Sequence, residues 1–202
     1  IETISREDGR MSFFRIEPFL HGELYRYWAS VRGEQAVPSR SDVDPLGMVR
    51  LLPFIGLIER RAEGYFWRLI GTAIVEHFGR DPTGTQYGAG FSPTAFVAAT
   101  TATFDAALEQ QVPFFDEFIY RSAKGFPHAV SRLVCPLTGS SRHPPMVIHT
   151  RVHYYCSEGL PVSSLREEAW GELRNRWPVS SVEEVERRAA VWFAKASAPA
   201  PV

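Results

Sequence analysis

Hydrophobic residues near the start of the chain recur at helical spacing. Pro18 suits the first turn of a helix, and Arg32 followed by Gly33 is typical of a helix end. Between them, apolar and aromatic residues are three or four positions apart and so share one helix face: Leu20, Leu24, Tyr27, Trp28 and Val31. The pattern predicts an amphipathic helix over 18–32 with an aromatic stripe.

After this helix, short apolar runs alternate with turn residues. Asp44 directly before Pro45 predicts a short second helix, which Pro53 ends. The segments FIGLIE and YFWRLIG beyond it are typical of two strands of a hairpin. Further strand patterns cover 113–121, 128–137 and 146–155. Short turns join these last three strands, so they must run antiparallel.

Two helices are predicted between the hairpin and the later strands. Thr72 to Phe78 reads as a brief helix that Gly79 ends, and Ser92-Pro93 opens a longer helix that reaches about Gln110. The order of elements predicts an α+β fold, in which helices pack on a single antiparallel sheet of five strands.

The strand pattern is lost after Tyr155. We expect a helix around 165–176, and the capping box from Ser181 to Glu184 opens a terminal helix. Its apolar residues form a narrow seam of the coiled-coil type: Val182, Val185, Ala189 and Trp192. The seam lasts only about two heptads, which is too short to hold a dimer without other contacts.

These patterns divide the chain into one domain with two additions. We expect an N-terminal extension over 1–17, a domain over 18–157 that includes the first helix, and a C-terminal helical extension with a disordered tail over 158–202.

Composition and charge narrow the function classes. The 202 residues carry 22 basic and 23 acidic side chains, without the basic excess of a dedicated nucleic-acid binder. No apolar run approaches the roughly 20 residues that cross a bilayer, and the polar N-terminus is unlike a signal peptide. The only cysteines, Cys135 and Cys156, are too few for a disulfide framework. We therefore expect a cytoplasmic protein that binds neither nucleic acid nor membrane.

A series of short motifs follows a set order between about Glu23 and Tyr155. They are Tyr27-Trp28, Arg32-Gly33, Pro38-Ser39-Arg40, Asp42-Val43-Asp44-Pro45, Leu51-Leu52-Pro53, Trp67-Arg68-Leu69-Ile70-Gly71-Thr72, Phe78-Gly79-Arg80-Asp81, Thr83-Gly84 and Cys135-Pro136-Leu137. This order resembles that of an alphaproteobacterial PAS-domain family long carried as a domain of unknown function. The resemblance implies a five-stranded antiparallel sheet whose helices enclose a pocket on one face. It also implies sensing or protein interaction, and it carries over no cofactor residue.

Some motif residues are best explained by backbone geometry. Glycines after a strand or a helix permit positive φ, and an aspartate in a turn accepts hydrogen bonds from nearby N–H groups. This structural set is Gly71, Thr72, Gly79, Asp81 and Gly84. Arg68 lies inside an aromatic strand, and we interpret it as half of a buried pair with Asp42, Asp44 or Asp81, in preference to anion binding.

The six histidines raise the question of a metal or haem. His149 and His153 share a strand face, but four residues of strand span about 13 Å, so the two cannot hold one ion. His77, at the end of the short helix, is the better single haem candidate, although most such histidines are ordinary partly buried or capping residues. Cys135 is on a strand, where it does not suit flavin photochemistry and reads as a small buried residue. The sequence therefore requires no metal and no cofactor, and it disfavours haem and flavin.

Strand alternation suggests an apolar wall for a ligand pocket. The candidate pocket residues are Trp67, Leu69, His77, Phe118, Tyr120, Leu133, Cys135 and Ile148. The alternative for each of the strand residues is that it simply fills the core.

Together these observations predict a non-catalytic sensory or regulatory module of PAS type. It would bind a small molecule or a protein partner and signal through protein contacts, with self-association as a dimer among the options. The alternative is a small cavity enzyme that uses a single Asp or His for proton transfer or hydrolysis. Serine-hydrolase, P-loop and dinucleotide motifs are absent from the sequence.

Overall fold

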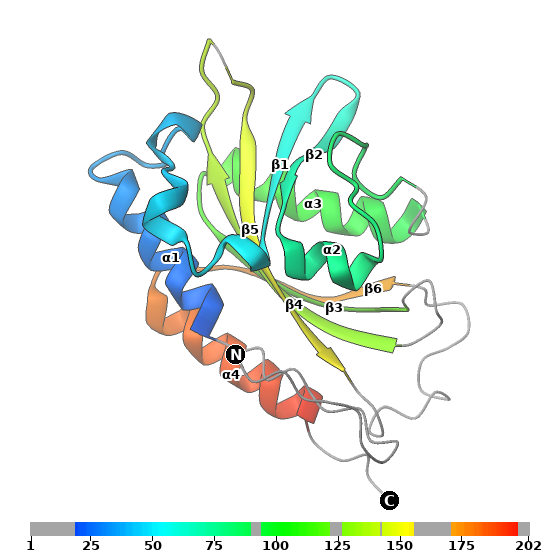
Figure 1. The fold of residues 1–202 in the computed structure, drawn as a ribbon. Helices are drawn as coiled ribbons and strands as arrows, with labels where there is room; N and C mark the ends of the chain where they lie inside the picture. The colour runs from blue at the N-terminus through cyan, green and yellow to red at the C-terminus, as the bar shows by residue number, and fades with distance from the viewer. Residues whose placement is uncertain (1–18, 90–93, 122–126, 142, 156–170, 198–202) are drawn as a thin grey trace, which may run out of the picture.

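A single antiparallel sheet organises the molecule (Figure 1). The computed structural model describes residues 19–89, 94–121, 127–141, 143–155 and 171–197. The strands are β1 (Ile55–Arg61), β2 (Gly64–Ile70), β3 (Phe114–Arg121), β4 (Pro127–Leu137), β5 (Met146–Tyr155) and β6 (Gly171–Pro178). They lie in the order β2-β1-β5-β4-β3-β6, and every neighbouring pair is antiparallel.

Helices cover both faces of this sheet. The helices are α1 (Phe19–Arg32), α2 (Thr72–Phe78), α3 (Thr94–Gln110) and α4 (Val182–Ser197). Figure 1 shows α1 and α4 against one face, called here the α1/α4 face, and α2 and α3 against the opposite α2/α3 face. The predicted α+β class, the hairpin and these helices are confirmed. In the described part of the chain, no helix is both long and apolar enough to span a membrane.

The expected short helix after Pro45 is replaced by separate 3₁₀ turns. They cover Arg40–Asp42, Pro45–Met48 and Leu52–Phe54. Asp44 does cap the second turn, since its Oδ1 accepts a hydrogen bond from the Leu46 N–H at 2.9 Å. Gly47 and Pro53 interrupt the segment, so helical structure forms only one turn at a time.

The sheet has six strands, and the prediction of five was therefore short by one. We expected a helix around 165–176, but its described part, from Gly171, belongs to β6, which pairs with β3. The half-buried Leu173, Asn175 and Trp177 alternate with exposed residues, which is the two-residue period of a strand. The backbone edge of β3 that faces away from β4 therefore forms hydrogen bonds with β6.

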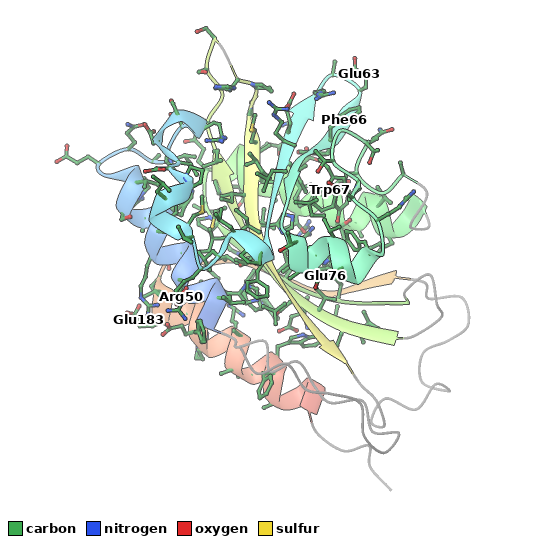
Figure 2. The ribbon with its side chains drawn as sticks, in the orientation of Figure 1. Arg50, Glu63, Phe66, Trp67, Glu76 and Glu183 are labelled. Carbon is green, nitrogen blue, oxygen red and sulfur yellow. The ribbon has the colours of Figure 1, made fainter. Side chains whose placement is uncertain are left out.

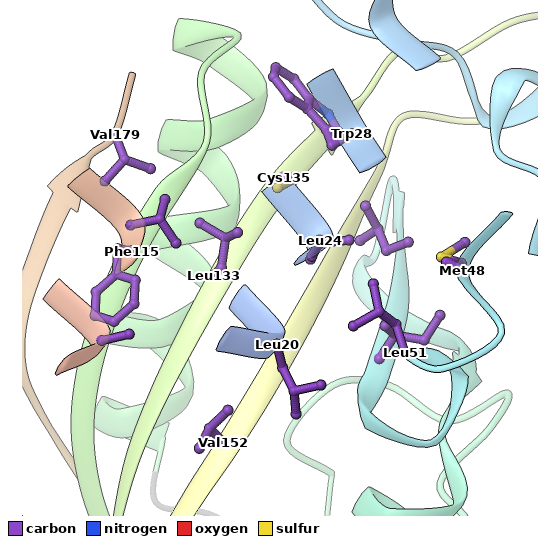
Figure 3. Packing of buried hydrophobic residues seen from close by; sticks show 14 of the residues in the cluster. Leu20, Leu24, Trp28, Met48, Leu51, Phe115, Leu133, Cys135, Val152 and Val179 are labelled. Carbon is purple, nitrogen blue, oxygen red and sulfur yellow. The ribbon is translucent and has the colours of Figure 1, made fainter. Parts of the chain in front are cut away.

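The core on the α1/α4 face is formed by both ends of the described chain. Figure 3 shows Leu24 of α1 beside Leu133 and Cys135 of β4. From α4, the seam residues Val185, Ala189 and Trp192 join the same cluster. These three residues of the predicted seam therefore pack inside the molecule, whereas Val182 is partly exposed. The domain boundary expected at residue 157 stays a prediction, but β6 and α4 beyond it share this sheet and core.

Candidate functional site

The α2/α3 face carries ionisable side chains in its interior. Asp116 on β3 lies directly opposite Arg132 on β4, and His149 on β5 pairs with Val134, two residues along β4. Alternation of side chains points all three toward α2 and α3, and all three are buried. A polar centre thus lies beneath an otherwise apolar helical cover.

Arg132 is the most extensively hydrogen-bonded member of this centre. Its Nη2 lies 2.5 Å from Asp116 Oδ2 and its Nε 3.1 Å from Oδ1, a bidentate pair. Its Nη1 donates to the Tyr87 hydroxyl at 3.2 Å, and Nη2 also donates to the Thr100 carbonyl at 3.3 Å. Burial opposes the charge, but Asp116 and Tyr87 outweigh burial and raise the pKa of Arg132. The guanidinium therefore stays protonated in the interior.

His149 is buried beside Arg132 with unused hydrogen-bonding capacity. Its exposed fraction is 1%, and neither ring nitrogen has a hydrogen-bond partner among the described residues. Burial is the main cause that lowers its pKa well below the usual range, followed by the charges of Arg132 and Arg151. The imidazole is therefore neutral at physiological pH, with one nitrogen a donor and the other an acceptor.

The space for the His149 ring depends on a glycine of β1. A Cβ on Gly56 would lie 2.3 Å from His149 Nε2 and 2.9 Å from Trp67 Cζ3. Both distances are too short for any side chain to be accommodated without movement. The lack of a side chain at Gly56 therefore provides the space that the rings of His149 and Trp67 occupy.

Aromatic rings surround this polar centre. Trp67 lies on the side of β2 where α2 and α3 pack, and its ring centroid is 5.8 Å from that of His149 (Figure 2). The Arg151 guanidinium lies 5.0 Å from the ring centroids of both Phe78 and Phe118. The charged and polar groups of this centre are thus packed against aromatic faces, which attract cations.

The predicted pocket residues do not form a single wall. Trp67 and Phe118 do belong to the α2/α3 face. Three others belong to the core on the opposite face: Leu133, Cys135 and Ile148. Leu69 also lies on that opposite face. Leu57 pairs with Leu69 and Ile58 pairs with Trp67, so Arg68 is the extra residue of a β-bulge. The bulge breaks the alternation that would have put Leu69 on the same face as Trp67. The side chains of His77 and Tyr120 lie outside the described residues.

The sequence interpretation missed the polar centre itself. The expectation of a buried pair for Arg68 is wrong, because Arg68 is exposed; a buried Arg–Asp pair is formed instead by Arg132 and Asp116. The expected partners of Arg68 cap their own turns instead, since each accepts a backbone N–H within three residues: Asp42, Asp44 and Asp81. A signal was present in the charged residues in the middle of two apolar strand patterns, Asp116 within 113–121 and Arg132 within 128–137.

The other motif residues act through the backbone. Gly79 and Gly84 have φ of 70° and 82°, as expected for left-handed positions. Gly71 has φ of −72°, so the expectation of positive φ is wrong there. It is needed for close approach, since a Cβ would lie 2.3 Å from the Leu52 carbonyl oxygen. Thr72 begins α2, and Asp81 accepts the Thr83 N–H at 2.9 Å.

Metal and cysteine chemistry receive little support from this geometry. Among the described residues, no three histidine, cysteine or acidic side chains lie close enough together to hold a metal ion. Cys135 is fully buried, and burial raises the pKa of its thiol well above the usual value. It is a core residue, as expected, whereas Cys156 lies outside the described residues.

The fold is an α+β domain with strand order β2-β1-β5-β4-β3 and helices between β2 and β3. The family model described as "PAS domain" matches residues 19–149, and the chain belongs to this family. The family predicted from the motifs is thereby confirmed, while the alphaproteobacterial origin stays a prediction. No curated protein matches the sequence.

Solved structures of VqmA are distantly similar to this chain. VqmA bound to DPO is 15% identical with a TM-score of 0.42, over 54% of this chain and 57% of that one. The Vibrio cholerae VqmA dimer without target DNA is 14% identical with a TM-score of 0.43, over 57% and 54%. A Vibrio cholerae VqmA–ligand–DNA complex is 15% identical with a TM-score of 0.42, over 55% of this chain and 52% of that one. This chain thus spans about half the length of those proteins. Similarity at this level carries no argument about what this chain binds, so the expected lack of nucleic-acid binding stays a prediction.

Proposed function

We propose that this chain is a PAS-type sensory module that binds a small polar molecule at His149, beneath α2 and α3, and signals through protein contacts. The observation that carries the proposal is the pair of unpartnered ring nitrogens on a histidine with an exposed fraction of 1%. A buried polar group without a partner costs about 1–3 kcal/mol. A ligand that offers one acceptor and one donor recovers that cost.

The chemistry around His149 favours a polar ligand of small size. Trp67 supplies an aromatic side, and Arg132 supplies a charge already neutralised by Asp116. A ligand with hydroxyl or carbonyl groups satisfies His149 without breaking the Arg132 pair. Affinity then comes from hydrogen bonds made in a setting from which water is excluded.

The central strands offer a route for the signal to the opposite face. Thr150 follows His149 on β5 and points to the α1/α4 face, where its hydroxyl lies 2.7 Å from His21 Nδ1 on α1. A shift of β5 on ligand binding therefore reaches α1 directly. Because α1 packs with α4 in the same core, this helical layer is the surface we assign to a protein partner or to self-association.

Native mass spectrometry with an absorption spectrum of the freshly purified chain tests the ligand. We expect an adduct of small-molecule mass on the wild type and its loss from His149→Leu, which removes both nitrogens. The exposed Arg187→Gln on α4, against the opposite face of the sheet, is the control and keeps the adduct. The placement is refuted by an adduct that survives His149→Leu, or by a wild type at its bare mass after incubation with a metabolite extract.

Within the part of the chain that the structure describes, no observation favours the enzyme alternative over ligand binding. It needs an ionisable group of shifted pKa in a pocket that solvent reaches. The histidines with a clearly lowered pKa, His21 and His149, are both buried, and neither lines the surface cleft described below.

A further inference from the structure

A second candidate site lies on the other face of the sheet. A cleft of about 400 Å³ opens beside β1 and β2. Its ionisable lining residues are Arg40, Arg68 and His143, and its apolar lining residues are Leu57, Leu69 and Met146. No carboxylate lines this cleft among the described residues. Arg40, Arg68 and His143 thus form a basic rim, and Leu57 and Met146 form an apolar floor.

The β-bulge in the hairpin builds one side of the cleft. Arg68 is the residue without a partner on β1, and in a bulge two successive residues oppose a single one. Arg68 and Leu69 therefore both line the cleft instead of pointing to opposite faces. Leu69 is 40% exposed, whereas Leu57 and Met146 beneath it are 5% and 2% exposed. A regular strand would have placed Leu69 beside Trp67.

The opposite side of the cleft is a loop held by backbone bonds. The Thr138 N–H at the end of β4 donates to the Pro38 carbonyl at 2.9 Å. Ser39 and Thr138 also form a parallel bridge. These contacts hold Arg40 on the rim, where its Nη1 donates to the Val43 carbonyl at 3.1 Å. The rim is thus positioned before any ligand arrives.

The positive charge of the rim is not neutralised within the described residues. Neither Arg40 nor Arg68 forms an ion pair with any described carboxylate. The aspartates nearest in sequence, Asp42 and Asp44, accept the Ser39 and Leu46 N–H groups at 2.8 and 2.9 Å. Two guanidinium groups therefore face the cleft with donors available, which favours a carboxylate.

We infer that this cleft binds a small amphipathic carboxylate. Its head group lies between Arg40 and Arg68, and its short apolar chain covers Leu69 and the floor formed by Leu57 and Met146. A cleft of about 400 Å³ is near the lower end of the range for small-molecule sites, which favours a chain of a few carbons. This inference is independent of the His149 site, which lies on the opposite face of the sheet.

Titration of the full chain with hexanoate, followed through methyl signals in NMR spectra, tests the inference. We expect saturable shifts of the methyl signals of Leu57, Leu69 and Met146. Hexan-1-ol supplies the chain without the charge, and inorganic phosphate supplies charge without the chain. Each is expected to bind at least about tenfold more weakly than hexanoate, because each makes only half of the contacts.

Single substitutions test the charged rim and the apolar floor of this cleft separately. Arg68→Gln should weaken hexanoate binding about five- to tenfold, the range expected when one charge-assisted hydrogen bond is lost from a partly exposed site. Leu69→Ser should also weaken hexanoate binding, because it removes apolar contact with the ligand's alkyl chain. The exposed Arg187→Gln on α4 is the matched control and leaves hexanoate binding unchanged. Unchanged affinity in Arg68→Gln, phosphate binding as tight as hexanoate, or loss of binding in His149→Leu alone would overturn the inference.

Discussion

Acidification should destabilise this protein through a buried histidine on α1. His21 is fully buried, with Nδ1 2.7 Å from the Thr150 hydroxyl and Nε2 2.8 Å from the Ser131 hydroxyl. Its ring also meets Phe115 edge-on, with centroids 5.3 Å apart. Burial lowers the pKa of His21 from 6.5 to about 3. The imidazole is thus neutral when it joins α1 to the sheet.

The direction and size of the effect follow from proton binding. Above pH 6.5 His21 is neutral in both the folded and the unfolded chain, so its stabilising contribution is complete. Between pH 6.5 and 3 the unfolded chain binds a proton that the folded chain excludes, and stability falls with pH. Each pH unit costs about 1.4 kcal/mol, so His21 alone removes about 2 kcal/mol of unfolding free energy at pH 5.

Urea denaturation at pH 7 and pH 5 measures this loss. His21→Leu should be less stable at pH 7, because the two hydroxyls lose their partner, yet it should lose about 2 kcal/mol less than the wild type between the two pH values. The exposed His143→Leu should behave like the wild type. The lowered pKa of His149 adds to the loss in all three proteins and cancels in the comparison. An equal loss in His21→Leu and wild type would refute the reasoning.

Two further substitutions test the polar centre of the α2/α3 face. Asp116→Asn leaves the Arg132 charge buried without a carboxylate, and we expect it to lower the unfolding free energy in urea by about 3–5 kcal/mol. The exposed Glu183→Gln is the control and should lower it little. Similar losses in the two variants would contradict a buried pair. Gly56→Ala places a Cβ 2.3 Å from His149 Nε2 and should cost about 1–3 kcal/mol. Adding His149→Ala should recover part of that cost, and strictly additive losses would show that the ring does not pack on Gly56.

Local patterns were sufficient for most of the elements. Thr72–Phe78 is a helix that ends at a glycine with φ of 70°, as its sequence predicts. The hairpin and α1 likewise show their patterns within short stretches of sequence. The strand β6 was missed because the polar Asn175 interrupts the apolar residues on its inward positions, and because β3 is needed to complete its hydrogen bonds.

The sequence by itself determined the family, the order of most elements and the capping residues, because these depend on neighbours along the chain. Only the tertiary structure decided which side chains share a face. Asp116 and Arg132 are opposite each other through cross-strand register, and the bulge at Arg68 sends Leu69 away from Trp67. Whether an arginine is buried or exposed depends on what covers it. That is why Arg132 is buried beneath α3, while Arg68 lines an open cleft.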